Sequence, residues 1–228
     1  MTAITLNLNP LGQLTDEAFS AICEANPEIK FERTADGALV IMSPTGGETG
    51  NRNSKLTARL EIWAEADSTG LTFDSSTCFK LPNGAERSPD AAWVSLARWN
   101  ALTPEQRRSF PPLAPDFVAE LRSASDSLEA LQAKMREYVA NGVQLGWLLD
   151  PQNQRVEVYR PGQSAEVLNS PESLSGEEVL PSFVLRLDEF FDLRQPNRLQ
   201  PGQPEAIGFT SSTHRLGSSA SKSGSLLL

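Results

Sequence analysis

The stretch PDFVAELRSASDSLEALQAKMREYVANGVQLGWLLD, residues 115–150, constrains the fold of this chain more than any other part. Its opening, PDFVAEL, is a short apolar run typical of a strand. Asp126 followed by Glu129 has the form of a capping box, which predicts a helix that ends at Asn141-Gly142. GWLLD follows as a second, buried strand. The order strand, helix, strand predicts a sheet with a helix packed beside it.

The remaining sequence adds hairpins and helices to this unit. KFERT and ALVIM, with Asp36-Gly37 between them, have the pattern of a β-hairpin, and RVEVYRP is expected to pair with GWLLD. Thr15 is the expected N-cap of a helix that ends near Asn26. A second helix is expected from about Asn53 to Ala66, after a loop, SPTGGETGN. We therefore expect an α/β protein with a central mixed β-sheet flanked by helices.

Shorter features complete the predicted domain. LTFDSS, TCFKL and DAAWVS are strand-like runs, and Thr103-Pro104-Glu105-Gln106 has the form of a capping box that opens a short helical insertion. VLPSFVLRLDEFFD is expected to be the last folded segment. From Gln195 onward Pro, Gly, Ser and Thr dominate. We therefore expect a folded domain over residues 1–194 and a disordered low-complexity tail over residues 195–228.

Composition excludes several classes of protein. No stretch of about eighteen apolar residues is present, so no membrane span is expected. The first residues lack the pattern of a secretory signal. Two cysteines, Cys23 and Cys78, are too few for a disulfide framework or a thiolate zinc site. These observations favour a soluble cytoplasmic protein.

The single histidine, His214, lies in the predicted tail. A folded core without histidine cannot carry Ser-His-Asp or Cys-His catalysis, or a histidine-ligated zinc ion. Its chemistry must rely on carboxylates, lysine, hydroxyls or a metal bound through oxygen. The formal net charge of −9 argues against an obvious nucleic-acid binder, because phosphate contacts need clustered Lys and Arg. An enzyme with a locally basic cleft would still be able to act on DNA.

Two carboxylates occupy unusual positions. Asp90 opens the apolar run DAAWV, and Glu120 lies inside the run FVAEL. If the two runs are neighbouring strands, both side chains can point the same way, with Glu120 on the face of Val118 and Arg122. Converging carboxylates repel unless a cation lies between them, and oxygen ligands suit Mg²⁺ or Mn²⁺, which polarises a phosphoryl oxygen and acidifies water. The alternative is that Asp90 belongs to a turn and Glu120 forms a salt bridge with Arg122.

Lys134 lies on the helix expected after Glu120. Lys134 and Tyr138 are four residues apart and therefore share one helical face, at the border of the expected core side. A lysine there would neutralise charge that develops on a phosphate, or orient the attacking water. The alternative is a solvated lysine whose apolar stem lies along the surface.

The ordered combination of SPDAAWV, PDFVAELRSASDS, LQAKMREYVANGVQLGWLLDP and VEVY resembles the Uma-type putative restriction endonucleases, a bacterial family of the PD-(D/E)XK superfamily. SPTGGETGNRN before a helix adds to the resemblance, which covers roughly residues 15–192. The resemblance implies a restriction-endonuclease-like fold and Mg²⁺-dependent (or Mn²⁺-dependent) hydrolysis of DNA phosphodiester bonds. Because cleavage of duplex DNA usually requires two active sites, it also implies a homodimer.

Carried over position by position, the resemblance makes Asp90 the superfamily aspartate and Glu120 the second metal carboxylate. The usual Glu-X-Lys ends here in Arg122. The resemblance places the lysine on the following helix instead, as Lys134, with Tyr138 beside it. Glu61, on the preceding helix, is an additional candidate acid.

Two other functions stay open at this point. One is a catalytically inactive nuclease-fold module that binds nucleic acid or a protein partner, which the acidic net charge and the Arg122 departure motivate. The other is a carboxylate–metal hydrolase that acts on small phosphate esters.

Overall fold

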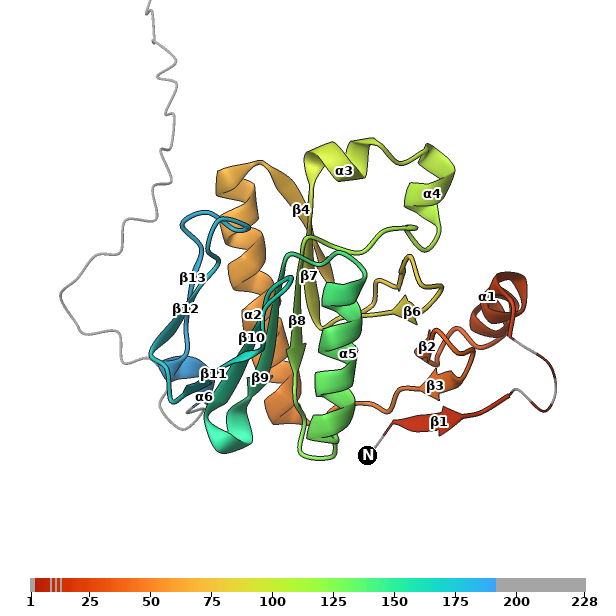
Figure 1. The fold of residues 1–228 in the computed structure, drawn as a ribbon, viewed down its shortest axis with the longest axis horizontal. Helices are drawn as coiled ribbons and strands as arrows, with labels where there is room; N and C mark the ends of the chain where they lie inside the picture. Colours follow the sequence, from red (N-terminus) through yellow and green to blue (C-terminus); the bar gives the residue numbers. More distant parts are fainter. Residues whose placement is uncertain (1–2, 9, 11, 13, 192–228) are drawn as a thin grey trace, which may run out of the picture. The chain divides into compact units, whose positions relative to one another are not determined.

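Strand β8 (Phe117–Leu121) lies inside a six-stranded sheet with the order β11-β10-β9-β8-β7-β4 (Figure 1). The sheet belongs to a computed structural model that describes residues 3–8, 10, 12 and 14–191. Strands β8 and β9 are parallel, and the other neighbours are antiparallel, so the predicted mixed sheet is confirmed. The remaining strands of this sheet are β4 (Gly70–Asp74), β7 (Ala91–Ser95), β9 (Leu145–Asp150), β10 (Arg155–Tyr159) and β11 (Glu166–Asn169).

Helix α5 (Leu128–Ala140) connects the parallel strands β8 and β9, which need a crossover of this kind. Ser127 is its N-cap and accepts a hydrogen bond from the amide of Ala130. The sequence placed this cap at Asp126, and that was wrong by one residue. The Asp126 carboxylate instead accepts a hydrogen bond from the amide of Ser123 at 2.8 Å, within the loop before the helix. The predicted strand–helix–strand unit itself is confirmed.

Two helices cover opposite faces of the sheet. Helix α2 (Gly47–Asp67) buries Leu60 in one apolar cluster with Ala119 of β8. Helix α5 buries Met135 in a second cluster with Val118 of β8. All five residues of β8 are buried, as expected for a strand covered on both faces. The side chains of β8 therefore alternate between an α2 face and an α5 face.

Helix α2 is longer than the sequence predicted. We expected it to begin near Asn53, but it begins at Gly47 with Gly46 as N-cap, so the predicted loop SPTGGETGN is partly helical. A glycine costs a helix only about 1 kcal/mol relative to alanine, which a tertiary contact can offset. Arg52 supplies such a contact by donating a hydrogen bond from Nε to the carbonyl oxygen of Phe190 at 2.8 Å.

A second, five-stranded sheet has the order β1-β3-β2-β6-β5 (Figure 1). Helix α1 (Asp16–Ala25), capped by Thr15 as predicted, buries Phe19 in a cluster with Phe31 of β2. The predicted hairpin with Asp36-Gly37 at its turn is confirmed by the pairing of β2 with β3. The strands are β1 (Ile4–Leu6), β2 (Phe31–Arg33), β3 (Leu39–Ile41), β5 (Phe79–Lys80) and β6 (Glu86–Arg87).

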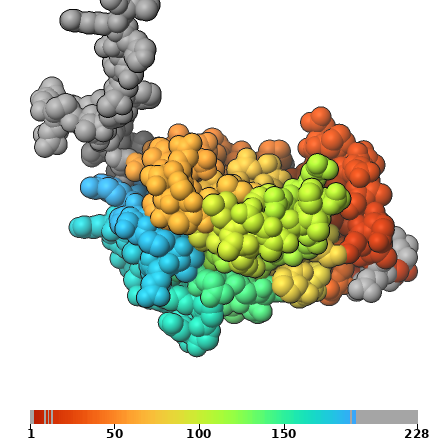
Figure 2. Space-filling model, turned by 90° about the horizontal axis from the view of Figure 1, so that it is seen from above, coloured from red at the N-terminus to blue at the C-terminus, as the bar shows by residue number. Residues whose placement is uncertain are grey.

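Short elements complete the described chain. The capping box predicted at Thr103 is present and opens α4. Seen from above, the α3–α4 segment lies between α2 and the segment around α1 (Figure 2). The elements not yet given are α3 (Leu96–Asn100), α4 (Pro104–Arg108), a 3₁₀ turn η2 (Pro151–Asn153), β12 (Ser173–Ser175), β13 (Val184–Arg186) and α6 (Asp188–Phe191).

Two sequence predictions remain, the low-complexity tail and the absence of a membrane span. The predicted tail, residues 195–228, and His214 lie outside the described residues. None of the helices in the described part of the chain combines the length and the apolar character needed to cross a bilayer.

Candidate active site

Asp90 directly precedes β7 and lies opposite Glu120 of the neighbouring strand β8. Strand β7 pairs with β8 in antiparallel register, with Ala91 opposite Ala119, so Asp90 occupies the next position, opposite Glu120. The amide of Leu121 donates a hydrogen bond to Asp90 Oδ2 at 2.7 Å, which holds the aspartate beside β8. Directly opposed residues have Cβ atoms about 4.5–5.5 Å apart. The expectation that the two runs are neighbouring strands is therefore confirmed.

Two side chains of α5 bind the Glu120 carboxylate. Lys134 Nζ lies 2.8 Å from Glu120 Oε1, and the Tyr138 hydroxyl donates to the same oxygen at 2.9 Å. The four-residue spacing places both side chains on one helical face, as predicted. Lys134 is not the solvated lysine of the alternative interpretation, because its side chain is only 10% exposed.

The second sheet contributes a carboxylate that the sequence did not reveal. Glu32 of β2 accepts a hydrogen bond from Lys134 Nζ at 2.8 Å, so the ammonium lies between Glu32 and Glu120. The amide of Ser88 also donates to Glu32, at 3.0 Å. Glu32 lies 88 residues before Glu120 in the sequence. The only local signal was a charged residue inside the short strand KFERT, next to the apolar Phe31.

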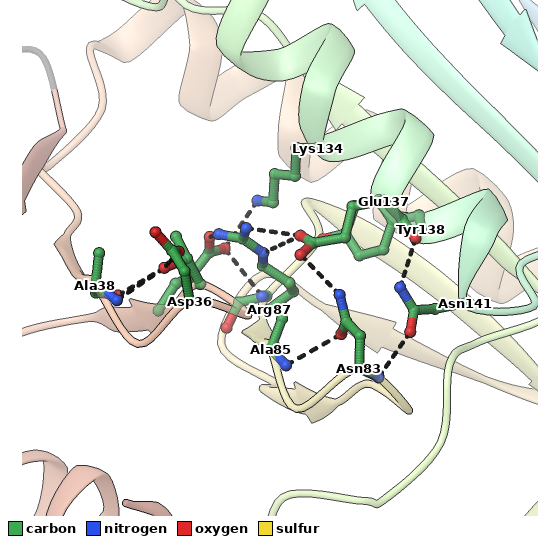
Figure 3. A network of polar contacts seen from close by, with 12 residues as sticks. Asp36, Ala38, Asn83, Ala85, Arg87, Lys134, Glu137, Tyr138 and Asn141 are labelled. Carbon is green, nitrogen blue, oxygen red and sulfur yellow. Dashed lines mark hydrogen bonds and ion pairs between the residues drawn. The ribbon is translucent and has the colours of Figure 1, made fainter. Parts of the chain in front are cut away.

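A polar network extends from this cluster along α5. Arg87 Nη1 lies 3.3 Å from Glu32, and its Nε donates to Glu137 at 2.6 Å. Glu137 in turn accepts a hydrogen bond from the side-chain amide of Asn83 at 3.0 Å. Figure 3 shows Lys134 and Glu137 projecting from α5 toward Arg87. The network ties the turn before β6 to the helix that carries Lys134.

Burial governs the protonation of the two opposed carboxylates. It raises the pKa of Asp90, which the Leu121 amide and Lys134 partly oppose. Burial also raises the pKa of Glu120 to about 7. The attraction of Lys134 lowers this pKa, whereas repulsion from Asp90 and Glu32 raises it further. Because Asp90 and Glu120 repel each other, a cation bound between these two carboxylates would relieve that repulsion.

The other groups of the cluster have fixed charge states. Burial would lower the pKa of Lys134, but Glu120 and Glu32 raise it above its ordinary value, so the ammonium stays protonated. Burial opposes ionisation of Glu32, yet Lys134 and Arg87 hold its pKa below its ordinary value. Burial and the nearby carboxylates raise the pKa of Tyr138 far above its usual range. Tyr138 is therefore a neutral hydrogen-bond donor to Glu120.

Two of the sequence candidates have other partners. The alternative interpretation expected a salt bridge between Arg122 and Glu120, but Arg122 binds other residues. Its Nη1 lies 2.7 Å from Asp150 Oδ2, and its Nε donates to the Asp126 carbonyl. Glu61 is exposed on α2, which packs against the opposite face of the sheet from α5, and it accepts a hydrogen bond from Thr72 of β4. The structure does not bring Glu61 to the cluster around Glu120.

The donor set fits a divalent ion that keeps most of its water. Among the described His, Cys, Asp and Glu side chains, no group of three or more is arranged to hold a metal ion. Glu32 is already engaged by Lys134, Arg87 and the Ser88 amide. Both oxygens of Glu32 are used in this way, whereas Lys134 and Tyr138 contact only Oε1 of Glu120 and the Leu121 amide contacts only Oδ2 of Asp90. Asp90 and Glu120 are therefore the candidate ligands, and Mg²⁺ is commonly bound by one or two carboxylates while it retains several waters.

Comparison with known proteins gives two matches. A family model, Uma2, described as "Putative restriction endonuclease", matches residues 16–188. Among solved structures, the chain is similar to a "putative nuclease belonging to DUF820" from Anabaena variabilis, with 20% sequence identity and a TM-score of 0.63. The match covers 72% of this chain and 90% of that chain, and it shows a restriction-endonuclease-like fold. No significant match was found among curated proteins.

Proposed function

The chain belongs to the Uma2 family, described as "Putative restriction endonuclease", and we propose that it is a metal-dependent nuclease that hydrolyses DNA phosphodiester bonds. The observation that carries the proposal is the position of Asp90 opposite Glu120, held there by the Leu121 amide, with Lys134 bonded to Glu120. A carboxylate pair beside a lysine supplies both metal ligands and a cation for a phosphate.

Asp90 and Glu120 would hold Mg²⁺ or Mn²⁺. When bound, such an ion supplies Lewis acidity toward a phosphoryl oxygen and acidifies a water molecule. Lys134 contributes a fixed positive charge, because its two carboxylate partners keep it protonated. It therefore acts as a hydrogen-bond donor that orients water or stabilises charge on the phosphate, and not as a general base.

Glu32 and Tyr138 are positioning residues in this proposal. Glu32 holds the Lys134 ammonium from the side opposite Glu120, and Tyr138 fixes one oxygen of Glu120. Groups that orient metal ligands typically contribute about 10–100-fold to metal affinity or activity. The site thus draws on both sheets and on α5.

DNA as the substrate and a homodimeric assembly are further parts of the proposal. Hydrolysis of both strands of a duplex usually involves two active sites, which a symmetric dimer supplies.

The test is cleavage of supercoiled plasmid and of single-stranded DNA by the full chain across Mg²⁺ and Mn²⁺ concentrations, with EDTA as the metal-free control. We expect nicking or linearisation that requires the metal. Cleavage that persists in EDTA would contradict metal dependence. Folded protein that binds these DNAs without cleaving them under any metal condition would favour the inactive module. Hydrolysis of bis(p-nitrophenyl) phosphate without DNA cleavage would favour the small-ester hydrolase.

Two observations weigh against the inactive module. The departure at Arg122 does not leave the site without a lysine, since Lys134 lies 2.8 Å from Glu120. Arg122 itself is engaged by Asp150 on the neighbouring strand.

A further inference from the structure

Strand β2 presents two different faces. Phe31 is buried in the cluster that contains Phe19 of α1, and the Arg33 guanidinium lies over the Phe19 ring, 5.7 Å from its centroid. Glu32, between them, points the other way and binds Lys134. This alternation is the ordinary consequence of extended backbone, in which successive side chains lie on opposite faces. One face of β2 therefore belongs to α1 and the other to the candidate active site.

Lys30 extends the face of Glu32. The amide of Met42 donates to the carbonyl oxygen of Lys30 at 2.9 Å, which continues the pairing of Phe31 with Ile41 by one residue. Two residues along a strand separate side chains of one face by about 7 Å. Lys30 thus lies beside Glu32 on the active-site side of β2, and its positive charge acts on Asp90.

The two lysines near the carboxylate pair differ in how they are engaged. The Lys134 ammonium is bonded to both Glu120 and Glu32. Lys30 is half-buried, and within the described part of the chain its ammonium makes no hydrogen bond or ion pair. A lysine in this state retains its capacity to bind an anion, and lysine commonly binds phosphate as a point charge.

We propose that Lys30 contacts a backbone phosphate of DNA bound at the Asp90–Glu120 site, which makes the second sheet part of the substrate-binding surface. This inference rests on the proposed function, because it takes the ligand to be DNA. It assigns different tasks to the two lysines. Lys134 is held in place at Glu120, and Lys30 binds the substrate.

The salt dependence of DNA binding tests this assignment. The full chain is titrated onto a short fluorescein-labelled duplex with Ca²⁺ in place of Mg²⁺, and fluorescence anisotropy is measured at several NaCl concentrations. Each lost lysine–phosphate contact lowers the slope of log K against log salt by about 0.9 in magnitude. We therefore expect Lys30→Gln to lower the slope by about 0.9 and to weaken binding about threefold to tenfold.

Two variants are the controls. Lys30→Arg keeps the positive charge and should keep the wild-type slope. Arg108→Gln removes an exposed cation of α4, outside the site, and should also keep it. If the wild type binds DNA and the Lys30→Gln variant keeps the wild-type salt slope, the inference about Lys30 is overturned. The proposed function is not affected by that result. Wild type that neither binds nor cleaves DNA would reject the proposed function and, with it, the DNA ligand assigned to Lys30.

Discussion

Replacing Glu120 with glutamine should reduce metal-dependent DNA cleavage by about 10³-fold or more. The expected loss exceeds the roughly 10–100-fold effect of residues that only orient metal ligands, because Glu120 would itself be a ligand. Cleavage of supercoiled plasmid at saturating Mg²⁺, measured as a single-turnover rate, gives the comparison with wild type. Glu65→Gln removes an exposed carboxylate of α2 and is the matched control, for which wild-type cleavage is expected.

The Glu120→Gln variant should also fold. A glutamine oxygen can still accept hydrogen bonds from Tyr138 and Lys134, which contact a single oxygen of Glu120. Glu120 has a pKa of about 7 in the folded protein against an ordinary value of 4.5. Stability from this group is fully present below pH 4.5 and is lost as the pH rises toward 7. Without divalent metal, the variant should therefore gain stability relative to wild type across this range. Cleavage by Glu120→Gln at the wild-type rate would reject the site assignment.

Replacing Lys134 with methionine should destabilise the protein by about 3 kcal/mol, because removal of one partner leaves buried charges uncompensated. The side chains of Glu32 and Glu120 are only 3% and 6% exposed, so water would compensate them poorly. For a chain of this size the change corresponds to a fall in Tm of about 6–12 °C. Thermal unfolding in EDTA, followed by circular dichroism, is the measurement.

A double-mutant cycle separates the ion pair from simple loss of packing. Adding Glu32→Gln to Lys134→Met removes one of the two carboxylates that lost the Lys134 ammonium. The double variant should then be less destabilised than the sum of the single variants, with a coupling energy of about 1–3 kcal/mol. Additive effects would contradict the bonded arrangement of Lys134 between Glu32 and Glu120.

Local patterns predicted much of the fold and the centre of the site. The alternation of β8 placed Glu120 on the face of Val118, and the four-residue spacing placed Lys134 and Tyr138 on one face of α5. Both features depend only on the geometry of a single strand or helix, so they can be predicted from a short stretch of sequence. The structure confirms both arrangements.

The partners of these residues depended on tertiary structure and were not predicted. Glu32 reaches Lys134 only because the second sheet packs beside α5, and no local pattern in KFERT specifies that contact. Likewise, the alternative interpretation paired Arg122 with Glu120 on its own strand, but Asp150 at the end of the neighbouring strand β9 is its partner. Strand register across a parallel pair decides this choice, and the sequence of one strand does not contain it.

The start of α2 was misjudged for a different reason. The glycines of SPTGGETGN lower helix propensity, which favoured a loop. The helix nevertheless extends to Gly47, where Arg52 of its second turn binds the carbonyl oxygen of Phe190. Propensity was outweighed by a contact with the last described helix.

The central claim is that Asp90 and Glu120 together bind a divalent ion, and anomalous scattering from Mn²⁺ tests it most directly. Crystals of the full chain are soaked in MnCl₂, and an anomalous difference map is calculated. The account predicts an anomalous peak between the Asp90 and Glu120 carboxylates, on the α5 face of β7 and β8. Well-diffracting crystals with no peak at this position, or with Mn²⁺ held only by other residues, would contradict it.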